Sequence, residues 1–261
     1  MTGSRLRQCI SHLLKNGRRF MKYRDQTEEW IGKIVKGRSF VDIGGIGVDS
    51  CNERISVSIR SGAARSAMAD IRPFGFHEWE TFEKKMAEKK LSGYDRYDNV
   101  DINDPLLHER IPRFDVVHCT GIFYHLANPV LALHNVRQIV GEHLIINTVT
   151  IPEKVENENG SLTFEGNSAL FLPGISEHER SVLRVHYQNK FGWDLNDVAP
   201  RLGDGKAVMP YYDHDGMSCW PYWWLFTDAA FRSFVSVLRF EILDEWKWED
   251  HALSLLTKKI S

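Results

Sequence analysis

The chain has 261 residues, of which 43% are hydrophobic and 26% charged, a composition typical of a globular protein with one large core, or one core and an insertion. A formal net charge of −2 excludes a surface covered with nucleic-acid-binding charge, but it is compatible with a local basic patch. The four cysteines are scattered without a C-x-x-C pair, which indicates reduced thiols in the cytoplasm and no zinc site.

Residues 1–36 are expected to be helical, because apolar residues recur at helical spacing around Leu6–Leu14 and again around Trp30–Val35. Lys and Arg residues between Arg5 and Arg24 form either a solvated helix face or a patch that meets a phosphate or an acidic substrate. We expect no signal peptide, since no continuous apolar stretch follows the basic residues. No apolar run approaches the roughly 20 residues that span a bilayer, so no membrane partner is expected.

The stretch Ser39–Ser50, SFVDIGGIGVDS, predicts a buried strand at Ser39–Ile43, a glycine-rich turn and the start of a helix. Glycines in such a turn let a ligand approach the backbone, and a helix start offers free N–H groups to a carboxylate or phosphate. The turn glycines are Gly44, Gly45 and Gly47. The alternative is a plain strand–turn–helix unit without a ligand.

Two details of this stretch favour S-adenosylmethionine over a dinucleotide as the ligand. A dinucleotide site needs G-x-G-x-x-G, and counting from Gly45 the third glycine position is occupied by Ser50. Asp42, at the strand end, would repel a pyrophosphate, but it suits a ligand that carries an ammonium group. We therefore expect S-adenosylmethionine as the cofactor.

Strands and helices alternate from Ser39 to about Val149, which predicts a mostly parallel sheet with helices on both faces. A helix from Pro129 is expected to be capped by Asn128, and the last helix, Thr227–Leu238, by Thr227. Further strands are expected at Ser66–Asp70, Asn99–Ile102, Phe114–Thr120 and His143–Thr150, a helix at about His77–Lys90, and an antiparallel edge hairpin at Phe240–Glu245 and Ala252–Lys258.

Residues 151–226 interrupt this alternation with a long stretch rich in Gly, Pro, Asn and Asp. Loops of this length inside a domain are usually functional or carry small elements of their own. We expect four regions: a helical extension or lid at 1–38, a cofactor-binding core at 39–150, a substrate-recognition insertion at 151–226, and a final helix with a strand pair at 227–261 that completes the core.

Polar residues stand at the ends of predicted strands, where ligands bind in an open α/β sheet. They are Asp42, Asp70, Asp101 and Thr120. Because buried unpaired carboxylates are costly, their joint placement indicates a ligand with an ammonium group, a ribose diol and an exocyclic amine. Asp70 would accept hydrogen bonds from the ribose, and Asp101 with the Ile102 backbone would meet the adenine edge. Each acid taken alone also fits a helix cap or a turn.

These segments, in this order, resemble the class I S-adenosylmethionine-dependent methyltransferases over roughly Ser39–Val149. The VDIGGIG segment is similar to the first motif of that family, and Asp70 with Ile71 stands where its ribose-binding acid is found. The DIND segment, Asp101–Asp104, resembles its adenine-binding motif. The resemblance implies an α/β fold with a Rossmann-like, doubly wound, mostly parallel sheet of seven strands, an N-terminal helical extension and an insertion before the last helix.

The segment FDVVHCTGIFYHLANPVLALHNV is similar to the fourth motif of the family, most closely in the branch of tRNA wobble-uridine carboxymethyl-transferring enzymes. By this likeness, Thr120 and Tyr124 would line the sulfonium and methionine end of the cofactor, with Gly121 between them. The segment MKYRDQTEEW does not align with the basic residues that hold a carboxylated cofactor in that branch, so plain S-adenosylmethionine is expected. The matched positions are Gly121, Tyr124, His125, Pro129 and Leu131.

His125 is the candidate for proton handling. An imidazole titrates near pH 6.5, so it can accept a hydroxyl proton at neutral pH. The alternative is a structural histidine that orients its loop by hydrogen bonds, and the sequence does not separate the two roles. His118 is assigned to the fourth strand rather than to chemistry.

Aromatic residues gather just before the final helix. Such side chains can stack on a sugar, a base or an aromatic acceptor, or they can anchor the insertion on the sheet, as is equally expected for Trp223 and Phe226. Asp213, His214 and Asp215 lie among them, but no further spaced ligand completes a metal site, so no metal is expected. The predicted acceptor-binding residues are Tyr211, Tyr212, Trp220, Trp223 and Trp224.

The sequence therefore predicts an S-adenosylmethionine-dependent methyltransferase with a small-molecule acceptor, such as a sugar or a specialised metabolite, modified at a hydroxyl group. An RNA methyltransferase is a less favoured alternative, suggested by the fourth motif and the basic N-terminal segment. A non-catalytic module that binds the cofactor is an alternative of another class, and a dinucleotide oxidoreductase comes third. The oligomeric state is not indicated.

Overall fold

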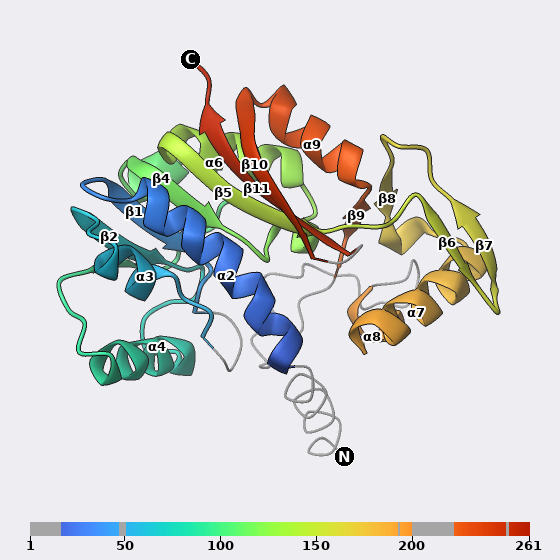
Figure 1. The fold of residues 1–261 in the computed structure, drawn as a ribbon, viewed down its shortest axis with the longest axis horizontal. Helices are drawn as coiled ribbons and strands as arrows, with labels where there is room; N and C mark the ends of the chain where they lie inside the picture. The colour runs from blue at the N-terminus through green and yellow to red at the C-terminus, as the bar shows by residue number, and fades with distance from the viewer. Residues whose placement is uncertain (1–16, 47–50, 193, 200–221, 249–250) are drawn as a thin grey trace.

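The computed structural model describes residues 17–46, 51–192, 194–199, 222–248 and 251–261, which form a seven-stranded sheet with helices on both faces (Figure 1). From one edge to the other, its strands are β10 (Phe240–Trp248), β11 (Ala252–Lys259), β5 (Val140–Val149), β4 (Phe114–Cys119), β1 (Ser39–Ile43), β2 (Arg65–Ala69) and β3 (Asp95–Tyr97). Strands β3, β2, β1, β4 and β5 run parallel, and β11 runs antiparallel to both β5 and β10. None of the helices that the structure describes is long and apolar enough to cross a membrane.

All predicted strands but the third are confirmed within a few residues. The third is expected at Asn99–Ile102, and this prediction is wrong, because β3 spans Asp95–Tyr97. Asn99 has a φ of 52° and turns the chain out of the sheet. Val100 and Ile102 are buried in the main core cluster from the loop that follows. Their apolar character therefore reflects packing and does not mark a strand.

The two faces of the sheet carry different sets of helices. One face is covered by α2 (Gly17–Ile34), α3 (Ile55–Arg60) and α4 (His77–Glu88), and the other by α5 (Leu107–Arg110), α6 (Pro129–Ile139) and α9 (Asp228–Val237) (Figure 1). Along β1, Phe40 packs with Trp30 of α2, whereas Val41 belongs to the cluster of α6 and α9. Burial on both faces explains why the central strands are continuous apolar runs in the sequence.

The predicted N-terminal helices are found in part. Helix α2 covers Gly17–Ile34, and residues 1–16 lie outside the described part of the chain. Trp30 and Ile31 are buried against the sheet, and Trp30 Nε1 donates a hydrogen bond to Asp244 Oδ2 of β10 at 2.8 Å. The second half of α2 therefore belongs to the core.

Two predicted helix caps are confirmed. Asn128 Oδ1 accepts a hydrogen bond from Leu131 N at 3.1 Å, and Pro129 is the first residue of α6. Thr227 Oγ1 accepts one from Ala230 N at 3.3 Å at the start of α9. Each cap satisfies an N–H group that the first helical turn leaves without an intrahelical partner.

The long stretch after β5 carries small elements of its own, as expected. Strands β6 (Lys154–Asn157) and β7 (Gly160–Thr163) form a hairpin, and β8 (Ala169–Phe171) pairs antiparallel with β9 (Trp224–Phe226). The stretch also contains η2 (Leu172–Gly174), α7 (Glu177–Phe191) and α8 (Leu195–Val198). These elements lie beside the main sheet and share a core cluster that includes Val155, Leu183 and Tyr187 (Figure 1).

Phe231 and Val237 lie on the same helix, α9, but only Phe231 is in the core. Phe231 is 0% exposed, whereas Val237 is 72% exposed. We expect Phe231→Ala to lower the free energy of unfolding by about 3–5 kcal/mol, because it removes buried apolar area and leaves a cavity. Val237→Ala is the control and should change it by less than about 0.5 kcal/mol. Urea unfolding followed by circular dichroism measures both, and equal losses would contradict this placement of α9.

Candidate functional site

Strands β1 and β4 lie side by side in the sheet, but the chain leaves them toward opposite edges. From β1 it continues to β2 on one side, and from β4 to β5 on the other. In open α/β sheets, ligands bind outside the carboxyl ends of the strands at such a switch point. The candidate site is therefore the region above the ends of β1 and β4, where Gly44 and Thr120 begin the connecting loops.

The turn after β1 needs glycine at both of its described glycine positions. Gly44 has a φ of +78°, in the left-handed region, and a Cβ there would lie 2.7 Å from Ile122 Cδ1. A Cβ on Gly45 would overlap the Asp42 carboxylate, so the backbone of the turn lies directly on that side chain. Gly47, the third predicted glycine, lies outside the described part of the chain. The two described glycines leave a bare backbone at the switch point.

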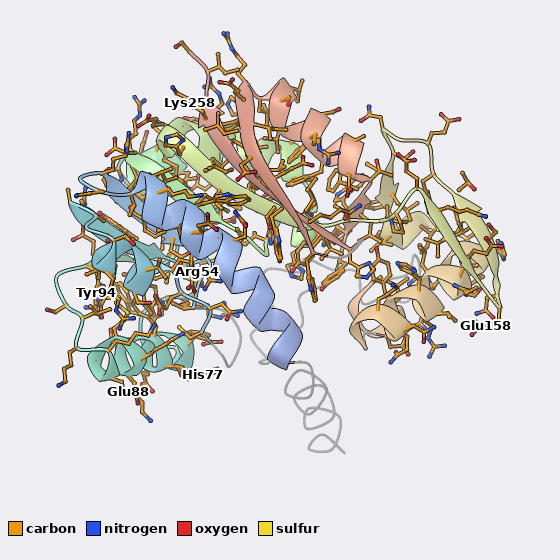
Figure 2. All side chains as sticks on the ribbon, in the orientation of Figure 1. Arg54, His77, Glu88, Tyr94, Glu158 and Lys258 are labelled. Atoms are coloured by element: carbon orange, nitrogen blue, oxygen red, sulfur yellow. The ribbon has the colours of Figure 1, made fainter. Side chains whose placement is uncertain are left out.

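Asp42 is buried near the carboxyl end of β1, at the floor of the candidate site. Its side chain is fully covered, Oδ2 accepts a hydrogen bond from Arg54 N at 2.6 Å, and Oδ1 lies 2.6 Å from His118 Nδ1. Arg54 (Figure 2) is itself buried, and its Nη1 donates to Asn52 O at 2.9 Å. Both oxygens of Asp42 thus have partners within the protein, and its contact with an ammonium group stays a prediction.

Two polar residues of the site were not predicted. His118 of β4 bonds Asp42 through Nδ1, and its Nε2 lies 3.3 Å from Thr120 Oγ1. Asn147 of β5 accepts a hydrogen bond from Gly121 N at 2.5 Å and so ties the loop after β4 to the neighbouring strand. The alternation of side chains along a strand could have indicated both residues. Residues 118 and 120 share one face of β4, and the amide of Asn147 interrupts the apolar run of β5.

Asp70 follows β2 directly and is also buried. Its Oδ1 accepts a hydrogen bond from Arg72 N at 2.9 Å and lies 3.4 Å from Arg72 Nη1. Burial raises the pKa of Asp70 to about 6, and the nearby Arg72 offsets only part of this effect. Ile71, which is half-buried, follows it in the chain. At neutral pH the carboxyl group of Asp70 is ionised, at a cost in folding stability.

The predicted adenine loop folds back on itself. Asp101 Oδ1 accepts hydrogen bonds from Asn103 N at 2.8 Å and from Asn103 Nδ2 at 3.0 Å, which is an Asx turn. Ile102 is buried, and its carbonyl oxygen accepts from Asn135 Nδ2 of α6 at 3.0 Å. The contact of these residues with adenine stays a prediction, with the Ile102 N–H as the backbone group on offer.

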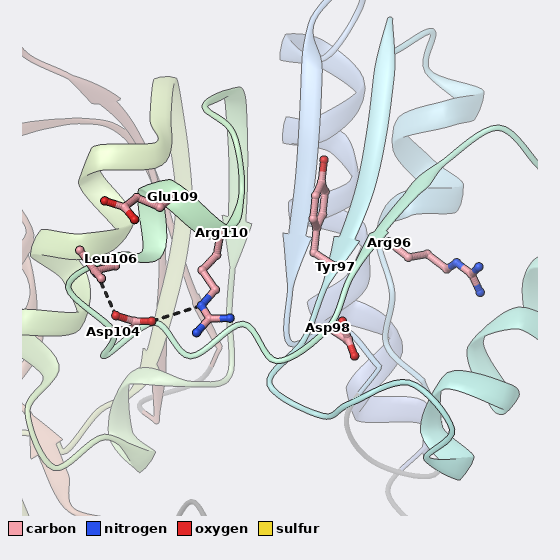
Figure 3. A pocket seen from close by; sticks show the side chains of 7 residues that line it. All are labelled: Arg96, Tyr97, Asp98, Asp104, Leu106, Glu109 and Arg110. Atoms are coloured by element: carbon pink, nitrogen blue, oxygen red, sulfur yellow. Dashed lines mark hydrogen bonds and ion pairs between the residues drawn. The ribbon is translucent and has the colours of Figure 1, made fainter.

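An open pocket of about 450 Å³ lies at the edge of the sheet, beside the end of β3 (Figure 3). It is separated from the switch point by β2, and Asp104, the last residue of the predicted adenine-binding segment, is among the residues that line it. Asp104 uses its carboxylate locally, on Leu106 N at 2.9 Å and on Arg110 Nε at 3.4 Å. The lining residues are Arg96, Tyr97, Asp98, Asp104, Leu106, Glu109 and Arg110. We assign no ligand to this pocket.

The structure brings Tyr124, His125 and part of the predicted aromatic cluster together. Tyr124 and His125 end the short helix η1 (Phe123–His125), and their rings lie 4.2 Å apart, both within 5 Å of the Tyr222 ring. Trp223 N donates to Tyr124 O at 2.8 Å, and Trp224 Nε1 donates to Ala127 O at 3.2 Å. The segment before β9 is therefore held on η1, next to the end of β4.

The other predicted acceptor residues, Tyr211, Tyr212 and Trp220, lie outside the described residues, and so do Asp213, His214 and Asp215. Within the described part of the chain, no group of three or more His, Cys, Asp or Glu side chains is placed to hold a metal ion. The described site thus consists of two buried acids, one histidine on β4, a second histidine on η1, and the aromatic residues around η1.

Asp70 should make stability depend on pH. A carboxyl group with a folded pKa of about 6 and an unfolded pKa of about 4 destabilises the fold as pH rises from about 4 to 6, by up to about 3 kcal/mol. Asn at this position mimics the protonated acid. The free energy of unfolding of Asp70→Asn should therefore equal that of the wild type near pH 4 and exceed it by about 1–3 kcal/mol at pH 8.

Urea unfolding between pH 4 and pH 8 measures this difference. Glu109→Gln, on an exposed carboxyl group of α5, is the control and should follow the wild type at every pH. A loss of stability in Asp70→Asn that is the same at all pH values would contradict the raised pKa.

A scan against protein-family models and a search of curated proteins give no match for the sequence. Solved structures do match. Magnesium protoporphyrin IX methyltransferase from Synechocystis PCC 6803, with bound SAH, is 13% identical at a TM-score of 0.51, and the match covers 93% of this chain and 84% of that one. The N-terminal domain of EvdMO1, in the presence of SAH and D-fucose, is 12% identical at 0.51, with coverages of 90% and 82%.

An S-adenosylmethionine-dependent methyltransferase from Mesorhizobium loti is 11% identical at a TM-score of 0.51, with 90% of this chain and 96% of that chain covered. At identities this low, the likeness of the structures shows the fold and does not show the activity. In each of these three matches, the alignment covers at least 90% of this chain. The chain has the fold of the class I S-adenosylmethionine-dependent methyltransferases.

Proposed function

We propose that this chain is an S-adenosylmethionine-dependent methyltransferase that acts on a hydroxyl group of a small molecule, such as a sugar or a specialised metabolite. The observation that carries the proposal is the switch point itself: a bare glycine turn at Gly44–Gly45 next to a buried acid, Asp70, at the following strand end. Structures of the same fold hold SAH, and one of them is named for a porphyrin acceptor while another was solved with D-fucose.

The residues at the switch point fit this cofactor. Asp70 is ionised at neutral pH and is held in place by Arg72, so it is ready to accept hydrogen bonds from ribose hydroxyls. Ile71, which is half-buried, would offer apolar surface to the adenine ring, and Asp101 with the Ile102 backbone would meet the adenine edge. Gly44, Gly45 and Gly121 would admit the cofactor to the backbone, and Thr120 and Tyr124 would lie at its sulfonium end.

When bound, the cofactor supplies an electrophilic methyl group on a positively charged sulfur. The protein then has to hold the acceptor oxygen in line with that group, keep water out and receive the hydroxyl proton. His125 is the residue for the proton, because it ends η1 beside the loop of Thr120. Tyr222 and Tyr124 flank its ring and would form the wall against which the acceptor packs.

The regions around the core complete the proposal. Residues 151–226 would recognise the acceptor, and 1–38 would close over the site, with 39–150 and 227–261 as the core. Trp223 and Trp224 would contribute acceptor contacts together with Tyr211, Tyr212 and Trp220. Cys51 and Cys119 are buried free thiols, which fits a reducing compartment such as the cytoplasm.

The first experiment is transfer of a labelled methyl group. The purified protein is incubated with methyl-labelled S-adenosylmethionine and an extract of its own source, and the products are treated with nuclease. Label in nuclease-resistant small molecules supports the proposal. Label released by nuclease would favour the RNA alternative, and binding of the cofactor without transfer to any fraction would favour a non-catalytic module.

Cofactor binding should depend on Asp70. We expect Asp70→Ala to raise the dissociation constant for S-adenosylmethionine about tenfold to hundredfold at pH 8, because two charge-assisted hydrogen bonds to the ribose are lost. Isothermal titration calorimetry measures the affinity, circular dichroism checks the fold, and Glu109→Gln is the control. In the wild type, affinity should also fall below about pH 6, as Asp70 takes up a proton. Unchanged affinity in Asp70→Ala would remove the ribose assignment.

His125 should affect the rate more than the binding of the cofactor. Once an acceptor is known, we expect His125→Ala to lower kcat roughly a hundredfold, since the acceptor hydroxyl loses its proton acceptor. The dissociation constant for S-adenosylmethionine should stay within about twofold, because in this proposal His125 would contact the acceptor and not the cofactor. An unchanged kcat would leave His125 with a purely structural role between Tyr124 and Tyr222.

A further inference from the structure

Three polar side chains form a continuous hydrogen-bonded row from the interior of the sheet to its carboxyl edge. Asp42 Oδ1 lies 2.6 Å from His118 Nδ1, and His118 Nε2 lies 3.3 Å from Thr120 Oγ1. Asp42 and His118 are register partners on adjacent strands, with exposures of 0% and 3%. Thr120 is half-buried at the end of the row, where β4 opens into its loop.

A direction can be assigned to each proton of this row from the chemistry of its groups. Asp42 Oδ2 accepts from the Arg54 backbone N–H, and we assign a proton to His118 Nδ1, because Oδ1 of a carboxylate can only accept. A neutral imidazole that carries its proton on Nδ1 has a lone pair on Nε2. In that tautomer the lone pair would face Thr120 Oγ1, 3.3 Å away, and the threonine hydroxyl would donate its proton inward to His118.

This direction leaves Thr120 with an oxygen that can only accept. Its lone pairs would then be turned away from His118. The backbone is held as well, because Gly121 N donates to Asn147 Oδ1 at 2.5 Å. A threonine hydroxyl can usually both donate and accept, but in this arrangement its oxygen would offer only lone pairs to a ligand at the switch point.

We propose that Asp42 and His118 act as positioning residues, which turn the Thr120 oxygen toward the positive sulfur of the bound cofactor. This rests on the proposed function above. An oriented oxygen lone pair attracts a sulfonium ion and has no such attraction for the neutral thioether that remains after methyl transfer. The row would therefore make the site bind S-adenosylmethionine more tightly than S-adenosylhomocysteine and would assist release of the product.

The test is the ratio of two dissociation constants, that for S-adenosylhomocysteine divided by that for S-adenosylmethionine, measured by calorimetry. We expect Thr120→Val to lower this ratio roughly fivefold to tenfold, which corresponds to the loss of one modest polar contact. Thr120→Ser restores the hydroxyl and should recover most of the ratio. His118→Asn keeps a donor toward Asp42 but does not reach Thr120, so it should lower the ratio as Thr120→Val does.

The double variant His118→Asn/Thr120→Val should show no further fall, because both changes remove the same contact. The matched control is Thr148→Val. Thr148 is a buried threonine of the neighbouring strand β5, and its Oγ1 has no hydrogen-bond partner among the described residues. This control should keep the wild-type ratio.

A second measurement reads the proton directly. The ¹⁵N signals of His118 should show the tautomer with the proton on Nδ1 in the wild type. In Asp42→Asn, the amide offers an N–H to Nδ1, so the proton should move to Nε2 and the ratio should fall. If Asp42→Asn does not fold, the comparison of Thr120→Val with Thr120→Ser decides alone.

The outcomes separate this inference from the function on which it rests. If Thr120→Val binds both ligands with an unchanged ratio, the methyltransferase proposal is unaffected, but the proposed role of the row is wrong. A wild-type His118 with its proton on Nε2 would overturn it as well. If the wild type binds neither ligand, both the function and the row are overturned.

Discussion

The buried carboxylate of Asp42 joins the parts from which the candidate site is built. It accepts from the backbone before α3, it contacts His118 on the neighbouring strand, and it supports the turn at Gly45 from below. A carboxylate in this position is costly unless every lone pair direction has a donor. Loss of any one contact would therefore disturb the turn, the helix start and the end of β4 together.

Two acids at adjacent strand ends thus have opposite situations. Asp42 has both carboxylate oxygens engaged within the protein. Asp70 is buried with a pKa raised to about 6, and among the described residues its carboxylate is hydrogen-bonded by Arg72 alone. The first arrangement stabilises and orients the surrounding structure. The second leaves a buried ionised carboxylate, and hydrogen bonds from the hydroxyl groups of a ligand would stabilise it. Groups with a shifted pKa of this kind are common in binding sites.

The sheet could be predicted because its central strands are apolar runs and its helices carry local cap signals at Asn128 and Thr227. The third strand could not, because Val100 and Ile102 are apolar for reasons of packing. The contact between Asp42 and His118 could not be predicted from local sequence patterns either. The two residues are 76 positions apart, and only the strand register brings them together. His125 and Trp223 were predicted, but their proximity depends on the pairing of β9 with β8.

The chain leaves the main sheet after β5 and passes the same place again at the end of β9. Ile151 N donates to Phe226 O at 2.9 Å, and Thr150 pairs with Phe226 in an isolated bridge. The two ends of the region between them therefore lie side by side. A region attached in this way can lengthen, shorten or be replaced by another without altering the strand order of the core, because its two ends need to meet only there. The same sheet could in this way serve acceptors of quite different size by exchange of one segment.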